Sequence, residues 1–281
     1  MSEDKIPIPS PRLPGRIHRT IWGDRTPLVG MIHLLPLPGS PRFGGSMDEI
    51  LTRASLEAVL LADAGFEGVL VENFGDAPFF PHGVPPETVA AMAVAVREVA
   101  ACVSIPVGVN VLRNDAESAL SVAVGAGARF IRVNIHTGSM FTDQGLLEGQ
   151  AYRTLRKRTS LQSTVAILAD VMVKHSTPPP GLTLESAARD VWSRGMADGV
   201  ILTGAETGMP TEPEVIQRVR EALSDEARIW VGSGASPETV SGLLQRADGV
   251  IVGSALQVGG IAGAGIDPSR VSAFVNALEG G

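Results

Sequence analysis

The sequence has a single cysteine, Cys102, among its 281 residues. One thiol cannot form an internal disulfide, so the fold has to be held together by its hydrophobic core. Cys102 falls at the end of an apolar stretch with helical spacing, and no histidine partner is suggested nearby. We therefore expect a buried structural thiol rather than a catalytic one.

Long hydrophobic runs and clusters of positive charge are also missing. No apolar stretch approaches the ~20 residues of a transmembrane helix, and residues 1–7 lack the apolar core of a signal peptide. The formal net charge is −7, without a basic cluster. These absences argue against nucleic acid as a partner and predict a soluble cytoplasmic protein.

Motifs for a resident cofactor are equally scarce. The sequence has no Walker loop, nucleophile elbow, cysteine cluster or His-Glu-x-x-His spacing. The glycine-rich residues 259–265 follow the last strand and lack the acidic residue of a dinucleotide site, so we predict no cofactor. A divalent metal is the open alternative. Its candidate ligands are His33, His136, His175, Glu72 and Asp170.

The chain does contain a regular alternation of short apolar runs and amphipathic stretches. From residue 27 it reads as eight strand–helix units, an order that builds a parallel sheet with right-handed crossovers. We predict an α/β fold, a (β/α)8 barrel over residues 27–281, preceded by an N-terminal arm over residues 1–26 that is partly ordered at best. Capping patterns place helix starts at Ser46, Asn114 and Thr211. The strands are expected at 27–33, 67–73, 105–112, 130–136, 165–175 and 199–204, and within 228–238 and 247–255.

Two glycine-containing loops near the C-terminus indicate a phosphate site. Each follows a short β-branched run, and barrels of this type often bind phosphate in the loops after strands seven and eight. Ser236 is expected to cap a helix that starts at Pro237, so that backbone N–H groups point into the first loop. The alternative is that the glycines only permit tight turns. The predicted phosphate-binding residues are Gly204, Ser233, Gly234, Gly253 and Ser254.

Polar side chains gather at the C-terminal ends of the predicted strands, where active sites of this fold lie. Core strands disfavour such residues, so their convergence at one rim is informative as a set. We expect Asn110 and Asn134 to orient substrate hydroxyl groups. The predicted substrate-binding residues are His33, Asn73, Asn110, Arg132, Asn134 and Thr203.

Acid/base chemistry is assigned to Glu72, Asp170, Lys174 and His175. Glu72 is either a general base or a carboxylate tied to a neighbouring basic side chain. Asp170 lies four residues before Lys174, so both face one side of a regular strand. There they would form a buried ion pair, with Lys174 as acid/base or Schiff-base amine. The alternative is a purely structural pair.

The loop at residues 74–85 holds three of the eight phenylalanines. That is much apolar surface for a loop, so we expect it to be a lid over the barrel mouth or a subunit contact. Exposed aromatic residues and the habits of this fold favour a homo-oligomer.

Four segments resemble the BtpA family. Residues 29–41, Val-Gly-Met-Ile-His-Leu-Leu-Pro-Leu-Pro-Gly-Ser-Pro, resemble its opening signature, and residues 71–76, 142–151 and 169–175 fit the same pattern. The resemblance runs from about residue 27 to 278 and implies a TIM barrel of the phosphate-binding type. The family is named for a cyanobacterial member needed for photosystem I biogenesis and peripheral to the thylakoid membrane, while other members look like sugar-metabolism proteins. It implies no particular catalytic residue.

The sequence shows no basic amphipathic helix, lipid-anchor motif or pigment-binding pattern. We therefore predict an enzyme acting on a small sugar-phosphate-like substrate by isomerase or aldolase/lyase chemistry. The alternative is a non-catalytic biogenesis or stability factor for a membrane complex, docking through residues 74–80. An open barrel mouth would favour the enzyme, and a plugged mouth with that loop splayed outward would favour the factor.

Overall fold

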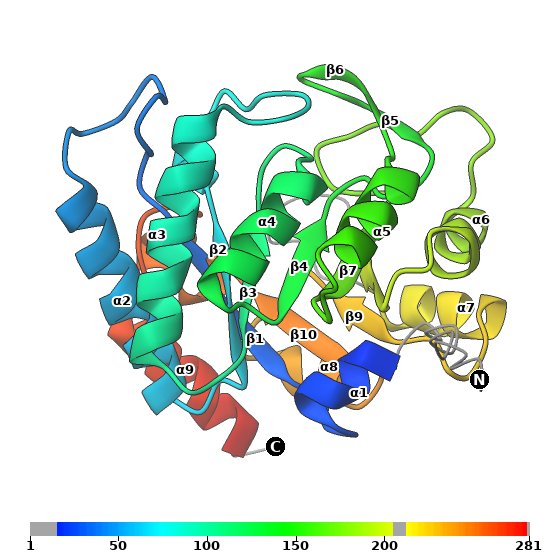
Figure 1. The fold of residues 1–281 in the computed structure, drawn as a ribbon. Coiled ribbons are helices and arrows are strands. Elements are labelled where there is room, and N and C mark those ends of the chain that lie inside the picture. Colours follow the sequence, from blue (N-terminus) through cyan, green and yellow to red (C-terminus); the bar gives the residue numbers. More distant parts are fainter. Residues whose placement is uncertain (1–15, 205–211, 280–281) are drawn as a thin grey trace, which may run out of the picture.

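Eight parallel strands close into a barrel in the computed structural model, in the order β1-β10-β9-β8-β7-β4-β3-β2 (Figure 1). The structure describes residues 16–204 and 212–279. The predicted (β/α)8 barrel is confirmed. Its strands are β1 (Leu28–His33), β2 (Gly68–Glu72), β3 (Val107–Asn110), β4 (Phe130–Val133), β7 (Ala166–Val171), β8 (Gly199–Leu202), β9 (Ile229–Val231) and β10 (Gly249–Val252).

Helices follow the strands and form the outer layer, as expected for right-handed crossovers. They are α2 (Met47–Asp63), α3 (Pro86–Cys102), α4 (Ala116–Ala126), α5 (Ala151–Ser160), α6 (Leu184–Arg189) with a π-helical turn (Asp190–Arg194), α7 (Pro213–Ala222), α8 (Val240–Leu244) and α9 (Pro268–Glu279). Every residue of the barrel strands is buried. Strands that are covered on both faces have nearly continuous apolar sequences, and this is why they could be predicted from the sequence.

The predicted helix starts have different outcomes. Ser46 caps α2 by accepting the Glu49 N–H, as expected. Asn114 does not cap α4, because its side chain instead pairs with the backbone N–H and C=O of Ile135, and Asp115 provides the cap. Thr211 lies outside the described residues. A capping pattern therefore locates a helix start to within a residue, but a competing partner decides which side chain is used.

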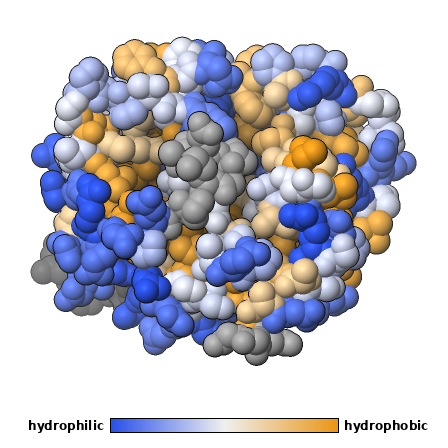
Figure 2. Space-filling model, turned by 180° about the vertical axis from the view of Figure 1, so that it is seen from behind, coloured by the Kyte–Doolittle hydropathy of each residue, from blue (hydrophilic) through white to orange (hydrophobic). Residues whose placement is uncertain are grey.

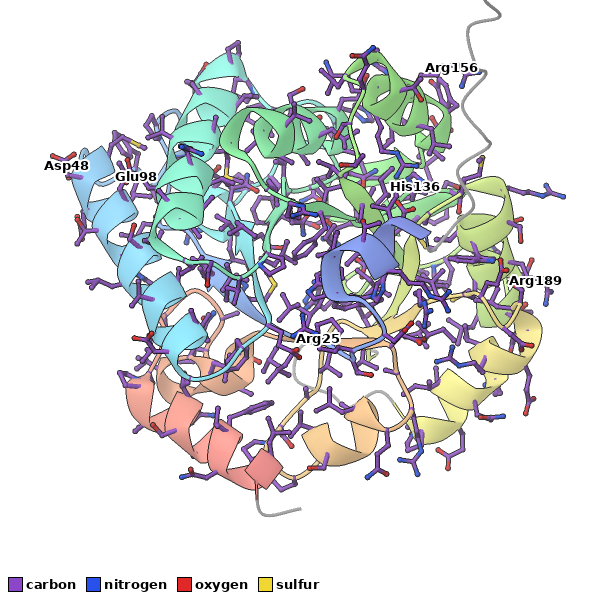
Figure 3. The ribbon with its side chains drawn as sticks, turned by 60° about the horizontal axis from the view of Figure 1, so that its bottom comes forward. Arg25, Asp48, Glu98, His136, Arg156 and Arg189 are labelled. Atoms are coloured by element: carbon purple, nitrogen blue, oxygen red, sulfur yellow. The ribbon has the colours of Figure 1, made fainter. Side chains whose placement is uncertain are left out.

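A helix that the sequence did not reveal closes the N-terminal end of the barrel. α1 (Arg16–Trp22) lies inside the expected N-terminal arm and crosses the bottom of the barrel (Figure 3). Trp22 is 1% exposed, with its ring 5.1 Å from that of Phe130 and 5.0 Å from that of Trp230. Its indole N–H donates to the Glu67 carbonyl oxygen at 3.1 Å. The bottom of the barrel is therefore sealed by aromatic packing.

An antiparallel hairpin, β5 (Ser139–Thr142) and β6 (Gly145–Glu148), was also missed by the sequence reading. It stands above the opposite end of the barrel, at the top of Figure 1. Its strands are only four residues long, and most of their residues are not buried, so no long apolar run marks them.

The molecular surface corrects one expectation. Cys102 is exposed at the end of α3, not buried, because the last turn of that helix turns it outward. Seen from behind, hydrophobic residues interrupt the hydrophilic surface in several places (Figure 2). Leu56 and Ile261 are the most exposed large apolar side chains of the described chain. Within the described residues, no helix combines the length and apolar composition required to cross a bilayer.

Candidate active site

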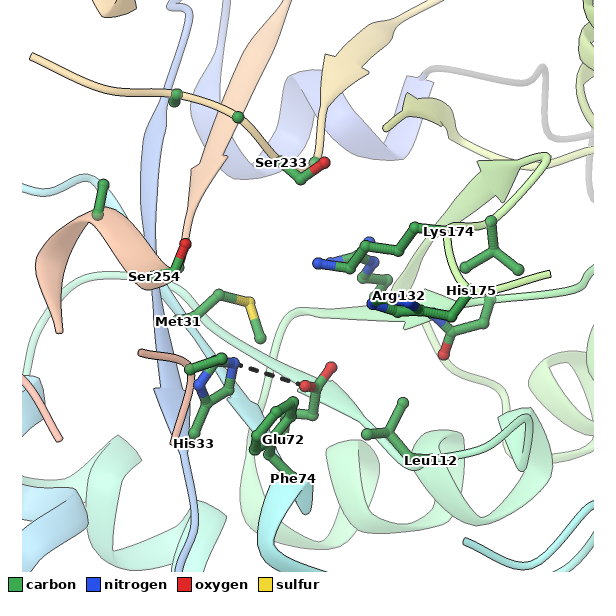
Figure 4. Close-up of a pocket in the computed structure, with 18 of the residues that line it drawn as sticks. Met31, His33, Glu72, Phe74, Leu112, Arg132, Lys174, His175, Ser233 and Ser254 are labelled. Atoms are coloured by element: carbon green, nitrogen blue, oxygen red, sulfur yellow. Dashed lines mark ion pairs between the residues drawn. The ribbon is translucent and has the colours of Figure 1, made fainter. Parts of the chain in front are cut away.

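A cavity of about 670 Å³ opens at the C-terminal mouth of the barrel. This volume is in the range of pockets that enclose small-molecule ligands. Two thirds of the predicted site residues come together around it (Figure 4). They are His33, Glu72, Arg132, Asn134, Lys174, His175, Ser233, Gly234, Gly253 and Ser254.

The other five predicted site residues do not line the cavity. Asp170 and Asn110 lie behind residues that do, as described below. Asn73 holds the loops together, since it donates to the Asp76 carboxylate and accepts the Leu112 N–H at 2.7 Å. Thr203 has a hydroxyl with no partner among the described residues. Gly204 donates its N–H to the Ser233 hydroxyl at 3.1 Å and so supports the predicted phosphate loop from behind.

Glu72 stands at the end of β2 with one carboxylate oxygen held from behind. The Asn110 side-chain amide donates to its Oε2 at 2.6 Å. Its Oε1 lies 3.6 Å from His33 Nε2. Within the described residues a histidine on β1 thus faces this oxygen, and no Arg or Lys lies within 4.0 Å of it. Glu72 is therefore held with its carboxylate at the cavity.

The tautomer of His33 follows from its hydrogen bonds. The backbone N–H of Gly263 donates to Nδ1 at 3.1 Å, and the Gln257 side-chain amide lies 2.7 Å from the same atom. Because Nδ1 accepts, the ring proton of the neutral form is on Nε2, which faces Glu72. Burial lowers the pKa of His33. The ring also stacks on Phe74 with centroids 4.4 Å apart, so its orientation is set from several sides.

Asp170 pairs with Arg132 on the neighbouring strand, so the predicted Asp170–Lys174 ion pair is wrong. The two Asp170 oxygens accept from Arg132 at 2.9 and 3.1 Å, and Asn134 donates to one of them at 2.9 Å. The prediction failed because β7 ends at Val171 and Met172 adopts a left-handed φ of 52°. The period of two is broken there, so the four-residue spacing no longer sets how Lys174 lies relative to Asp170.

Arg132 lines the cavity, and Asp170 holds its guanidinium from behind. A Cβ on Gly232 would lie 3.3 Å from Arg132 Nη2, so the absence of a side chain at Gly232 leaves room for the guanidinium. The side-chain oxygen of Asn134, Oδ1, is buried and has no hydrogen-bond partner within the described chain. Because Asn134 lines the cavity, a ligand hydroxyl would satisfy this acceptor.

Lys174 follows β7 and extends into the cavity beside Arg132 (Figure 4). Its carbonyl oxygen accepts from Arg113 Nη2 at 2.9 Å. Burial and, next, the Arg132 charge lower the pKa of Lys174 below its usual value. An ammonium that gives up its proton more readily can act as a base or as a Schiff-base amine. His175 beside it also has left-handed backbone, with φ at 58°.

The two predicted phosphate loops lie side by side on the wall formed by β9 and β10. The expected helix cap at Ser236 is wrong: α8 starts only at Val240, and the Ser236 hydroxyl donates to Glu238 instead. A five-residue helix contributes little dipole, so an anion would be bound by loop N–H groups and side chains. Arg270 adds a cation here, since its Nε donates to the Ala255 carbonyl oxygen at 2.9 Å.

Several lining residues were not among the predicted site residues. Arg113 follows β3, and its place after a strand end puts it among the polar residues of the predicted rim. Asp143 sits in the turn of the unrecognised hairpin. Phe79 comes from the aromatic loop that the sequence offered as a lid, whereas Arg270 lies on α9 and carries no local signal for this cavity. Phe74 and Phe79 cover part of the mouth as a lid would, whereas Phe80 is 51% exposed.

The candidate metal ligands do not assemble. Residues 16–204 and 212–279 contain no group of three or more His, Cys, Asp or Glu side chains placed to hold a metal ion. His136 is fully buried, with Nε2 2.8 Å from the Gly195 carbonyl oxygen, and burial lowers its pKa to about 4. His136 is thus a structural residue behind the rim.

Comparison with known proteins gives both relatives and structural neighbours. The BtpA family model matches residues 24–280. A Synechocystis protein named "Photosystem I biogenesis protein BtpA" is 48% identical over 91% of this chain and 88% of its own length. An uncharacterized protein of Pyrococcus abyssi is 43% identical over 83% of this chain and 88% of its own length.

Among solved structures, phosphoribosyl anthranilate isomerase from Thermus thermophilus superposes with a TM-score of 0.55. It covers 91% of this chain and 99% of its own, at 11% sequence identity. That likeness shows the TIM-barrel fold and no more.

Proposed function

This chain belongs to the BtpA family, and we propose that it is an enzyme that acts on a small phosphorylated substrate. The observation that carries the proposal is the cavity at the barrel mouth. Lys174 and Glu72 both line it, together with the two glycine loops at the ends of β9 and β10. An open mouth with acid/base groups inside favours catalysis over a purely structural role.

The charge of the cavity supports an anionic substrate. Four cationic side chains line it against two carboxylates, whereas the whole chain carries a net charge of −7. A cleft of sign opposite to its surroundings concentrates ligands of the complementary charge. The lining cations are Arg113, Arg132, Lys174 and Arg270, and the carboxylates are Glu72 and Asp143.

The proposed chemistry is proton transfer next to a carbonyl group. Glu72 removes a proton from the carbon beside the carbonyl, and Lys174 with Arg132 stabilises the negative charge that develops on the carbonyl oxygen. Return of the proton to the former carbonyl carbon, with the neighbouring hydroxyl proton passing to the carbonyl oxygen, gives an isomerase. Cleavage of a carbon–carbon bond gives a lyase, in which the Lys174 amine forms a Schiff base with the carbonyl carbon and water leaves. Two observations support these roles: the oriented Glu72 carboxylate and the lowered pKa of Lys174.

The fold neighbour is named as an isomerase of a phosphoribosyl compound, which agrees with the proposal at the level of fold. A second candidate function comes from the Synechocystis relative, whose name describes photosystem I biogenesis. In that case this chain would be a non-catalytic factor that docks a partner through the exposed Phe80. Phe74 and Phe79 line the cavity instead, which favours the enzyme.

A thermal-shift screen separates the two candidates. Purified protein is heated with inorganic phosphate and with a panel of sugar and nucleotide phosphates, with and without divalent metal. A ligand that binds the native state increases the free energy of unfolding, by about 2.7 kcal/mol when its concentration is 100 times Kd. This stabilisation raises the melting temperature. We expect a shift with one phosphosugar class.

The Gly234→Val variant tests the loop. Gly234 has a φ of +81°, and a side chain would strain the loop and crowd the anion. We expect the phosphate shift to be lost. Gly181→Val is the matched control, because Gly181 has a φ of +82° in an exposed loop that does not line the cavity. Absence of a shift with every phosphate at millimolar concentration would favour the docking factor.

A further inference from the structure

The cations of the cavity stand on two opposite sides of the barrel. In the closed ring, β4 is four strands from β10 in either direction, so these strands face each other. Arg113 follows β3 and Lys174 follows β7, the two strands that flank β4. Arg270 is held against the loop after β10. Figure 4 shows Lys174 and Ser254 on opposite sides of the cavity.

Arg113 is not neutralised as Arg132 is. Arg132 forms a bidentate ion pair with Asp170. Arg113 is only 7% exposed, yet within the described residues it forms no ion pair within 4.0 Å, and its hydrogen bond there goes to the Lys174 carbonyl oxygen. The lining carboxylate Asp143 is exposed and accepts from Gln144. A guanidinium has five N–H donors, and burying the charge without an anion is costly.

We propose that the substrate carries a second anionic group, a carboxylate or a second phosphate, which Arg113 binds across the cavity from the phosphate loops. This inference rests on the proposed function, because the phosphate loops bind the first group. The planar guanidinium matches either anion with two parallel hydrogen bonds. The cavity of about 670 Å³ has room for a chain of carbon atoms between the two groups.

The arrangement also explains where the acid/base groups stand. β2 lies between β1 and β3 in the ring, so Glu72 is on the wall that joins the two anion sites. Lys174 is fixed to Arg113 through its own carbonyl oxygen. A ligand held at both ends therefore exposes its middle carbons to Glu72, and its second anion lies close to the Lys174 amine. Fixing both ends of the substrate restricts the orientations of the reacting carbons.

The test compares matched pairs of ligands by calorimetry on the full-length protein. Glucose 6-phosphate is compared with 6-phosphogluconate, and fructose 6-phosphate with fructose 1,6-bisphosphate, alongside inorganic phosphate. We expect the doubly anionic member of at least one pair to bind about 10- to 100-fold more tightly, the gain typical of a hydrogen-bonded buried charge pair. The pair that shows the gain tells a carboxylate from a second phosphate.

Arg113→Gln should abolish that gain while the affinity for inorganic phosphate stays unchanged, and Arg113→Lys should restore part of it. Arg156→Gln, on the outer face of α5, is the matched control and should leave every affinity as it is. Equal affinity for both members of each pair overturns the second anion site and leaves the proposed function standing. An equal loss for phosphate and for doubly anionic ligands in Arg113→Gln also overturns it. Failure of every phosphate to bind overturns both proposals.

Discussion

Each end of the barrel buries a histidine against an aromatic ring, but the groups around the two histidines differ. At the bottom, His18 is 1% exposed, with its ring 5.0 Å from that of Trp22 and 5.4 Å from that of Trp230. Burial, followed by the Arg228 charge, lowers its pKa to about 4. At the mouth, His33 is 6% exposed and stacks on Phe74, but both ring nitrogens face polar groups.

This difference separates stability from chemistry. The bottom has aromatic surface packed against aromatic surface, so it contributes to folding. The mouth has oriented polar groups and an open cavity, so part of its polar surface is left for a ligand. In barrels of this type the C-terminal end carries the reaction and the N-terminal end carries stability. The following predictions test that division.

The largest expected effect is at the mouth. Lys174→Met removes the amine while keeping the length of the side chain, and we expect turnover of the phosphosugar found by screening to fall about 10²- to 10⁴-fold. Phosphate affinity should stay near that of the wild type, because Lys174 stands across the cavity from the proposed phosphate loop at Ser254. The melting temperature should also change little. Steady-state kinetics with phosphate calorimetry measures this. Full activity in the variant would remove Lys174 from the mechanism.

The next effect is at the bottom. Trp22→Ala empties a fully packed aromatic site, and we expect the free energy of unfolding to fall by about 3–5 kcal/mol. Urea unfolding measures this, with Phe80→Ala as the control because Phe80 is half exposed. Phosphate affinity of the folded variant should not change. If Trp22→Ala weakened phosphate binding as strongly as it lowered stability, the two ends would not be separable.

The smallest effect is the pH dependence of the bottom histidine. His18 has a pKa of about 4 when folded against an ordinary value of 6.5. Between these values the unfolded chain holds a proton that the folded chain does not, so stability falls as pH drops from 6.5 to 4. The slope is at most about 1.4 kcal/mol per pH unit for one histidine. His136 contributes in the same direction.

His18→Phe should remove the contribution of His18 to the pH dependence of the free energy of unfolding. It keeps an aromatic ring beside the two tryptophans. His82→Phe, at an exposed position, is the control and should leave the slope as it is. Urea unfolding at pH 4, 5, 6 and 7 gives the slopes. Equal slopes in wild type and His18→Phe would show that His18 is not the buried neutral ring that the structure places there.

Much of the site could be predicted from single positions. His33, Glu72 and Arg132 come at or near the ends of apolar runs, and a parallel barrel brings such ends to one rim. The pairings could not be predicted. Judged from the sequence, Asp170 could pair with Arg132 on the neighbouring strand or with Lys174 on its own segment. The left-handed backbone at Met172 decides between these two partners. Arg270 has no local signal, because α9 carries it back to the mouth.

The sequence by itself determined the order of the strands and helices that build the barrel, the rim at which polar residues gather and the position of the glycine loops. These features depend on sterics and on apolar periodicity within a few residues, and both can be recognised in the sequence alone. Only the tertiary structure decided which groups meet. Ring closure brings Gly263 to His33 across 230 positions and Asp170 to Arg132 across 38. Such contacts depend on the register between strands and on loop paths, which the local pattern does not encode.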